Sequence, residues 1–390
     1  MNDSGFDIII AGAGISGLLL ADGLSKRFKV LVIEEKIDIK DDKFWVTTED
    51  CLKGNERFLE CIDNKFDQML FSDAYGKSYE IKGKYILWNT LKLQNILKNN
   101  IILNGGVFAL GEKFCGYNNE SNYITVFSND KRYNARLLID CMGYKSPLIL
   151  SEDIIKIRGY YLIYGAKIKL KRNITPICLS NYILSKSPCF FEVFPTSQKE
   201  AYAVLLKPVR GFNSPRDLSK DFSFFIKKSI YSKYFNSEIN NIIKGIVPVG
   251  TVKKKALNRI LFFGESAQNN PSATGTCLTH LFRNYNDFIH FIEQSFDKNT
   301  FSARELSKVP EIMNDFSRKL QMIMFEELLD SNSKRFSSYI GYLPKISDET
   351  INTFLFGNIY LKDVVSIKKI KKIYKLKDFH VINILLKLLT

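Results

Sequence analysis

The chain has 390 residues, of which 45% are hydrophobic, and 56 Lys and Arg against 41 Asp and Glu give a formal net charge of +15. A chain of this length and composition can bury a sizeable core in two or three domains, which excludes intrinsic disorder. The cysteines form no CxxC pair and the histidines no HExxH motif. A disulfide scaffold and a metal site are therefore disfavoured, and we expect no bound metal.

No apolar run reaches the length of a membrane span and no signal-peptide pattern opens the chain, so we expect a cytoplasmic protein. The positive charge could serve binding to nucleic acid, to an anionic membrane surface or to acidic small molecules. It could equally reflect a genomic base composition that favours Lys codons. No nucleic-acid-binding module accompanies the charge. We therefore expect no nucleic-acid partner, and a basic nucleic-acid-binding protein is the remotest alternative.

The first elements of the chain predict a dinucleotide-binding unit. Residues 7–11 and 29–34 are apolar runs typical of buried parallel strands, and a glycine-rich turn and a helix lie between them. In this turn Gly12 makes the tight bend, Gly14 lets the backbone approach a pyrophosphate, and Gly17 lets the helix pack on the strand. The helix N-terminus offers free N–H groups and a partial positive charge to phosphates.

The second strand of this unit ends in an acid, Glu34, followed by Glu35. A carboxylate at this place accepts hydrogen bonds from an adenosine ribose and disfavours a 2′-phosphate, so FAD or NAD fits better than NADP. The unit gives the first predicted cofactor-binding residues: Gly12, Gly14, Ile15, Ser16, Gly17, Glu34 and Glu35.

Two later segments favour FAD over NAD. A predicted strand at 259–263 is followed by Gly-Glu, a loop and a helix from about Thr276 to Gln294, an order that resembles the second cofactor motif of flavoproteins with the para-hydroxybenzoate-hydroxylase-like fold. The resemblance implies that the loop passes the isoalloxazine ring and that the helix N-terminus faces the N1–C2=O edge of the flavin. Residues 137–143 resemble the strand end that covers the adenine side. These segments add the predicted cofactor-binding residues Asp140, Gly143, Gly264, Glu265, Pro271, Thr274, Gly275 and Thr276.

With these motifs the chain resembles the lycopene cyclase family of FAD proteins over most of its length. Residues 41–45, Asp-Asp-Lys-Phe-Trp, match the family's aspartate-then-tryptophan segment, and Trp45 is counted among the cofactor-binding residues. Residues 159–165 resemble its Gly-Tyr…Tyr-Gly strand. Residues 270–275 resemble its His-Pro-(Ser/Ala)-Thr-Gly turn, with one residue inserted and Asn for His. Its terminal helical region is matched by Leu343-Pro344, residues 354–358 and Asp363.

One departure from the family concerns the catalytic acid. In lycopene cyclases a strand after the substrate-domain proline carries an acidic pair, and one Glu is thought to protonate the polyene or stabilise its carbocation. Here Pro195 is followed by residues 201–208, which include Val204 and no carboxylate. Glu192 would be the catalytic acid if it faces the flavin among aromatic residues, which would raise its pKa. The alternative is that Glu192 points to solvent.

The predicted fold class is α/β, with a Rossmann-type FAD-binding domain of the glutathione-reductase and para-hydroxybenzoate-hydroxylase kind. We predict a discontinuous FAD domain (1–50, 85–150 and 245–300), a β-sheet substrate domain (51–84 and 151–244) and a C-terminal helical region (301–390) with a helix over 312–329. Residues 361–390 interleave lysines with apolar residues, which suits either peripheral membrane contact or a packed terminal helix with a solvated lysine face.

Two functions of different classes remain open. The first is an FAD-dependent oxidoreductase, a monooxygenase or dehydrogenase, that acts on a hydrophobic or aromatic small molecule in secondary-metabolite or isoprenoid biosynthesis. Its electrons would come from the substrate or from an external donor such as NAD(P)H. The second is a redox-neutral isomerase of the lycopene cyclase type, in which reduced FAD stabilises a cationic intermediate. The sequence leaves open the substrate, the oligomeric state and the roles of Cys141 and Cys277.

Overall fold

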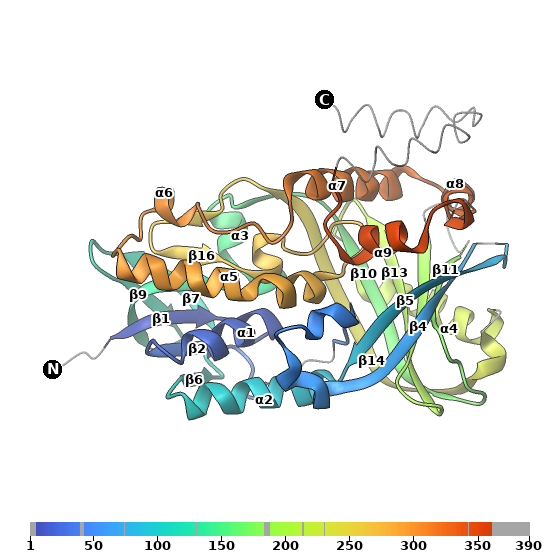
Figure 1. Cartoon of the computed structure of the whole chain (residues 1–390), viewed down its shortest axis with the longest axis horizontal. Helices are drawn as coiled ribbons and strands as arrows, with labels where there is room; N and C mark the ends of the chain where they lie inside the picture. Colours follow the sequence, from blue (N-terminus) through green and yellow to red (C-terminus); the bar gives the residue numbers. More distant parts are fainter. Residues whose placement is uncertain are drawn as a thin grey trace.

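Two eight-stranded sheets lie end to end along the long axis of the molecule, with helices around both (Figure 1). The computed structural model describes residues 5–39, 43–73, 75–129, 131–182, 188–212, 214–229, 231–341 and 343–360. Asp41, Asp42, Asp363 and the segment 361–390, for which the sequence predicts membrane contact or a terminal helix, lie outside the described residues. No helix within the described ranges is long and apolar enough to cross a membrane.

The first sheet is built around a parallel core in the order β16-β9-β1-β2-β6, with β15 antiparallel to β16 at one edge and a β7–β8 hairpin paired to β9. Its strands are β1 (Phe6–Ala11), β2 (Val30–Glu34), β6 (Val107–Leu110), β7 (Phe114–Asn119), β8 (Ile124–Ser128), β9 (Arg132–Asp140), β15 (Ala256–Leu257) and β16 (Ile260–Phe262). Ile8 and Ile10 pack under α1 (Ile15–Leu24), α2 (Thr90–Leu103) and α5 (Cys277–Asp297), whereas Ile9 packs on the opposite face. Burial on both faces explains why β1 shows no polar alternation.

The second sheet is antiparallel except where β11 pairs with β4, and its order is β14-β10-β13-β12-β11-β4-β5-β3. Its strands are β3 (Val46–Thr48), β4 (Ile62–Ser72), β5 (Ser78–Trp88), β10 (Ile155–Leu170), β11 (Ile177–Tyr182), β12 (Cys189–Pro195), β13 (Glu200–Val209) and β14 (Phe235–Val252). One face buries Phe191 against Phe222 and Phe225 of α4 (Ser219–Lys228). The opposite face turns toward the C-terminal helices.

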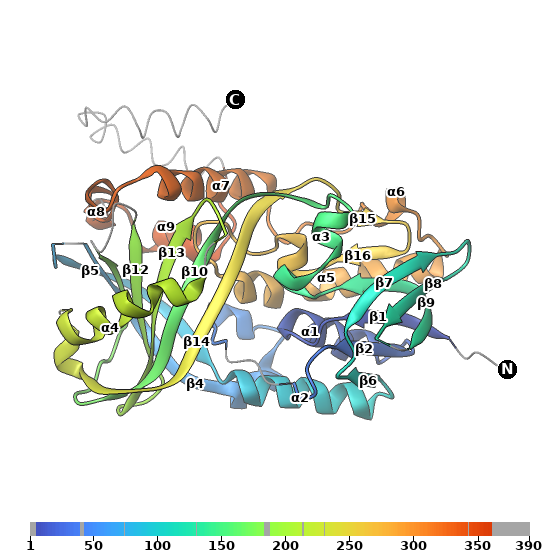
Figure 2. The ribbon, with the colours of Figure 1, turned by 180° about the vertical axis from the view of Figure 1, so that it is seen from behind.

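Three C-terminal helices cover that opposite face: α7 (Asp315–Asp330), α8 (Ser333–Ile340) and α9 (Asp348–Phe356). Figure 2 shows α7 and α8 along one side of the second sheet, away from α2. The remaining helical turns are short: α3 (Leu148–Ser151), α6 (Ala303–Leu306), η1 (Glu49–Leu52), η2 (Glu56–Cys61), η3 (Gly143–Lys145), η4 (Pro215–Leu218), η5 (Ser232–Tyr234), η6 (Gly264–Ala267) and η7 (Leu343–Lys345).

The strands and helices predicted within the described residues exist, with shifted ends. The helix predicted over 312–329 is α7 and begins at Asp315, because the Asn314 side chain accepts a hydrogen bond from the Ser317 N–H and caps the helix there. The strand predicted at 259–263 narrows to Ile260–Phe262, and Arg259 has a positive φ of 58°. The division into domains stays a prediction.

Candidate functional site

Backbone segments that are distant in the sequence meet at the carboxyl edge of the first sheet. The Gly12 N–H donates to the Ile33 carbonyl at 2.8 Å, and the Cys141 N–H donates to the Ala11 carbonyl at 2.8 Å. The Phe263 N–H continues the series with a 3.0 Å bond to the Asp140 carbonyl. Four strand ends are thereby fixed side by side, the arrangement at which ligands bind in open α/β sheets.

Glycines allow these segments to approach one another. A Cβ atom at Gly12, whose φ is +103°, would lie 2.6 Å from the Cys141 carbonyl oxygen, and one at Gly143 would lie 2.6 Å from Glu265 Oε2. A Cβ at Gly17 would collide with the Gly12 carbonyl, and one at Gly264 with the Ser16 side chain. Backbone contacts at Gly12 and Gly17, and the positive φ of Gly143 (+63°) and Gly264 (+77°), therefore require glycine at all four positions.

Gly14 and Gly275 differ in their surroundings, because a Cβ at either position would meet no atom within 4 Å, although the φ of +69° at Gly275 still favours glycine. Gly14 is the N-cap of α1 and has an ordinary φ of −68°, so neither packing nor strain requires glycine there. The α1 N-terminus has no side-chain cap, and neither has the N-terminus of α5 at Thr276. Two helix N-termini with uncapped N–H groups thus face open space, which suits an anionic or electron-rich group.

The space between the four strand ends and the N-termini of α1 and α5 is called the cradle below. Carboxylates lie on two sides of it. Glu34 accepts hydrogen bonds from the Ala13 N–H at 2.7 Å and the Lys36 N–H at 3.1 Å. Glu35 forms an ion pair with Lys145. Glu265 accepts a 3.2 Å hydrogen bond from the Tyr144 N–H, which connects the segment after β16 to the segment after β9.

Asp140 is fully buried and holds its own turn together. Its carboxyl group accepts hydrogen bonds from the Ser146 hydroxyl and from the Met142 N–H. Burial nevertheless raises the pKa of Asp140 to about 6. Asp140 therefore shapes the loop beside the cradle and does not project into it.

One cavity of about 1860 Å³ runs from this cradle to the covered face of the second sheet. The predicted site residues that line it are Gly12, Gly14, Ile15, Ser16, Glu34, Glu35, Trp45, Gly143, Glu192, Glu265, Thr274, Gly275 and Thr276. Those that lie behind its wall are Gly17, Asp140, Gly264 and Pro271. The cavity is thus continuous between the nucleotide motifs and Glu192.

The wall of the cavity away from the cradle is apolar. The sheet contributes Tyr161, Leu206 and their neighbours, and α7 contributes a stripe at i, i+4 spacing: Phe316, Leu320, Met324 and Leu328. An apolar surface of this extent suits a hydrophobic ligand better than a charged one. Sequence reasoning predicted the helix but not the face that it presents.

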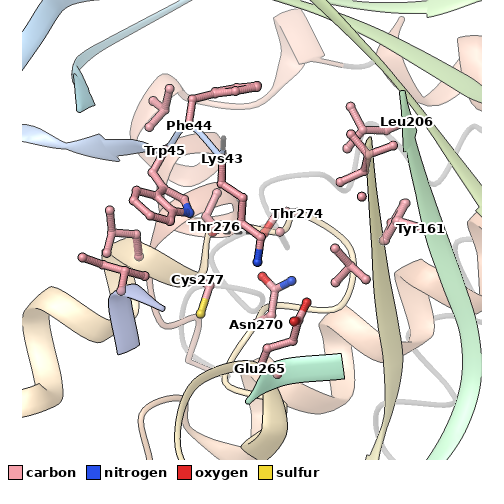
Figure 3. Close-up of a pocket in the computed structure, with 18 of the residues that line it drawn as sticks. Lys43, Phe44, Trp45, Tyr161, Leu206, Glu265, Asn270, Thr274, Thr276 and Cys277 are labelled. Atoms are coloured by element: carbon pink, nitrogen blue, oxygen red, sulfur yellow. Dashed lines mark hydrogen bonds between the residues drawn. The ribbon is translucent and has the colours of Figure 1, made fainter. Parts of the chain in front are cut away.

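A smaller polar cluster lies between the cradle and this apolar wall. Figure 3 shows Lys43, Asn270 and Glu265 pointing toward one another, with Cys277 beside them. Asn270 Oδ1 is buried and accepts no hydrogen bond within the described part of the chain, so it is available to a ligand. Burial raises the pKa of Cys277 to about 12, which keeps the thiol protonated. Lys43 lines the cavity but was not predicted as a site residue, although it lies two positions before the predicted Trp45.

Glu192 faces the cavity and not the solvent. It lies on β12 in antiparallel register with Val204 of β13, so the two side chains are neighbours on one face of the sheet. Burial raises the pKa of Glu192 to about 7. A carboxyl group with this pKa can both hold and release a proton near neutral pH.

The cradle fits FAD, because it offers open space at Gly14 and Gly275, two uncapped helix N-termini and an acceptor without a partner. The sequence model of the family described as lycopene cyclase protein matches residues 7–374. The chain belongs to the lycopene cyclase family. No curated protein sequence matches it significantly.

Solved structures show that the fold is that of FAD-binding flavoproteins. A geranylgeranyl bacteriochlorophyll reductase-like protein from Thermoplasma acidophilum superposes with a TM-score of 0.69 at 13% identity, over 93% of this chain and 98% of that one. A flavoprotein/dehydrogenase from Cytophaga hutchinsonii gives 0.71 at 13% identity, over 93% and 95%. Halogenase PltM, solved with phloroglucinol and FAD, gives 0.64 at 10% identity, over 84% and 77%. The predicted α/β fold with a Rossmann-type domain is confirmed.

The two kinds of glycine yield a matched test. We expect Gly17→Ala to lower the melting temperature strongly, because its methyl group would collide with the Gly12 carbonyl. Gly14→Ala should lower the melting temperature of the FAD-free protein only slightly, through the poorer N-cap, and weaken FAD binding at least about tenfold, because its methyl group enters only open space. Thermal scans and FAD titrations check both. Wild-type FAD affinity in Gly14→Ala would contradict the assignment of this space to the cofactor.

The pKa of Glu192 sets a pH dependence of stability. Because the folded-state pKa of about 7 lies above the ordinary 4.5, folding favours the protonated form, and wild-type stability falls as pH rises through this window. The stability of Glu192→Gln relative to wild type should therefore increase by about 2 kcal/mol between pH 5 and pH 8. Denaturant unfolding at both pH values measures it, with Glu80→Gln on the exposed surface as the control. An increment that does not change with pH would contradict burial of the carboxyl group.

Proposed function

We propose that the protein is an FAD-dependent oxidoreductase that acts on a hydrophobic small molecule, as in isoprenoid or secondary-metabolite biosynthesis. The observation that carries this proposal is the continuity of one cavity between the glycine cradle and the apolar face of the second sheet. A substrate lying on that face would be next to a cofactor bound in the cradle.

The residues of the cradle have distinct roles in holding the cofactor. The Gly14 backbone and the α1 N-terminus would bind the pyrophosphate, and the Glu34 carboxylate the adenosine ribose. Thr276 and the loop from Pro271 to Gly275 would border the isoalloxazine ring, with the positive end of α5 directed at it. FAD supplies two-electron redox chemistry when bound.

The walls of the cavity contribute to the chemistry by excluding water and supplying a proton. Apolar side chains from α7 and the sheet replace the solvent around the substrate, which strengthens every electrostatic interaction there. Glu192 holds a proton near neutral pH and can deliver it to the substrate or take one from it. The side chains of the cavity would thus bind and orient the substrate, and Glu192 would exchange a proton with it.

An anaerobic experiment tests the proposal. The purified protein is reconstituted with FAD, reduced stepwise with dithionite and mixed with hydrophobic candidate substrates, while the flavin absorbance near 450 nm is followed (an ordinary flavin band). We expect reoxidation, or reduction of the oxidised form, that depends on the substrate. The same mixtures are then exposed to O2, which a monooxygenase needs as its oxidant. A reconstituted protein that never binds FAD, or whose flavin shows no substrate-dependent change with or without O2 while no candidate is converted, contradicts the proposal.

A second function, a redox-neutral isomerase of the lycopene cyclase type, is favoured by one observation. Glu192 lies directly across the ladder from Val204, on the strand that takes the place of the acidic strand of the cyclases, so a carboxyl group is present beside that strand in the cavity. Family membership supports the same reading. If the protein is such an isomerase, lycopene is converted to a cyclised product in the presence of reduced FAD, and the absorbance spectrum of the flavin is the same before and after the reaction.

The register of β12 and β13 allows the acid to be moved. Glu192→Gln should reduce turnover about 100-fold or more with whichever substrate is active, because it removes the proton donor. The double variant Glu192→Val with Val204→Glu should regain at least a tenth of the activity, since the two side chains are cross-strand neighbours. Turnover under single-substrate conditions measures both. Full activity in Glu192→Gln would remove the acid from the mechanism.

A further inference from the structure

The loop from Pro271 to Gly275 is held from the substrate side of the cavity. Both backbone polar groups of Ala273, at its centre, bond to side chains of other elements. The Tyr161 hydroxyl of β10 donates to the Ala273 carbonyl oxygen at 3.2 Å, and the Ala273 N–H donates to Gln321 Oε1 of α7 at 3.0 Å. The backbone beside the predicted flavin ring is therefore fixed by groups outside the first sheet.

Gln321 joins this loop to a second helix. Its Nε2 group donates to the Phe354 carbonyl in the last turn of α9 at 2.9 Å, and its side chain is only 3% exposed. One buried amide thus satisfies a loop donor and one of the carbonyls that the end of a helix leaves unpaired. Thr276 strengthens the link with a 2.5 Å hydrogen bond to the Leu355 carbonyl.

The elements that hold Ala273 are also those that enclose the apolar cavity. Tyr161 lines the cavity and packs its ring against Phe325 of α7, with centroids 5.1 Å apart. Leu320, next to Gln321 on α7, and Phe354 of α9 line it too. A displacement of α7 or β10 is therefore transmitted directly to the loop.

We propose that Tyr161 and Gln321 are positioning residues that fix the 271–275 loop from the substrate side and so set how tightly FAD is bound. The inference rests on the proposed FAD site. Loss of either hydrogen bond frees one side of Ala273 and leaves a buried polar group without a partner. The loop then samples positions that no longer match the cofactor.

The test is an FAD titration, by fluorescence quenching, of the wild type, Tyr161→Phe, Gln321→Met and Gln321→Glu. Tyr161→Phe and Gln321→Met keep the side-chain volume and lose the hydrogen bonds, so the Kd for FAD should rise about fivefold to tenfold. Gln321→Glu keeps the acceptor for the Ala273 N–H and, as the protonated acid that burial favours, a donor for the Phe354 carbonyl, so the Kd should stay within about threefold of wild type. The visible spectrum of bound FAD should change in the first two variants only.

Two matched controls separate positioning from general stability. The first control is Tyr164→Phe, because Tyr164 lies on the same strand as Tyr161 but packs against Phe222 on the other face of the sheet. The second is Gln294→Met, because Gln294 lies on the exposed side of α5. Both should bind FAD as the wild type does. The double variant of Tyr161→Phe with Gln321→Met should lose less affinity than the product of the single losses, because both act on Ala273.

The outcomes are distinguishable. Variants at Tyr161 and Gln321 that bind FAD with wild-type affinity and spectrum overturn this inference alone, even when their melting temperatures fall, because a purely structural role would lower only stability. Equal losses in Gln321→Met and Gln321→Glu overturn the role assigned to the Ala273 N–H. A wild-type protein that binds no FAD overturns the proposed function together with the inference.

Discussion

The structure depends on backbone segments that touch without side chains between them. Gly12 lies against the Cys141 carbonyl, and Gly17 lies against the Gly12 carbonyl. These contacts bring the ends of four strands to one edge and direct the N-termini of α1 and α5 into the same space. A larger side chain at any of them would separate the strands and destroy the cradle before any ligand arrives.

Much of this cradle is local in sequence, and that part could be predicted. An apolar run without alternation specifies a strand buried on both faces, and glycines at fixed spacing specify the turn and the helix that follows. The helix predicted over 312–329 was also correct in kind. Its first residue is set by Asn314, whose side chain accepts a hydrogen bond from the Ser317 N–H and so caps the helix.

The far side of the cavity could not be predicted in the same way. Phe190, Phe191, Glu192 and Val193 show no polar alternation, so the sequence alone could not decide which face Glu192 occupies. The decision is tertiary, because α4 covers the face of Phe191 and leaves the opposite face to the cavity. The role of Gln321 depends likewise on two partners that lie 48 and 33 residues away along the chain.

The buried carboxyl group on β12 has a consequence for how the protein becomes ready to react. With a pKa of about 7, the resting protein at neutrality interconverts between a neutral interior and one that bears an isolated negative charge and attracts water. An apolar guest expels that water and makes the charged form more costly, so its arrival draws a proton onto Glu192. Binding of an apolar ligand would therefore by itself convert Glu192 into the protonated form that can act as an acid.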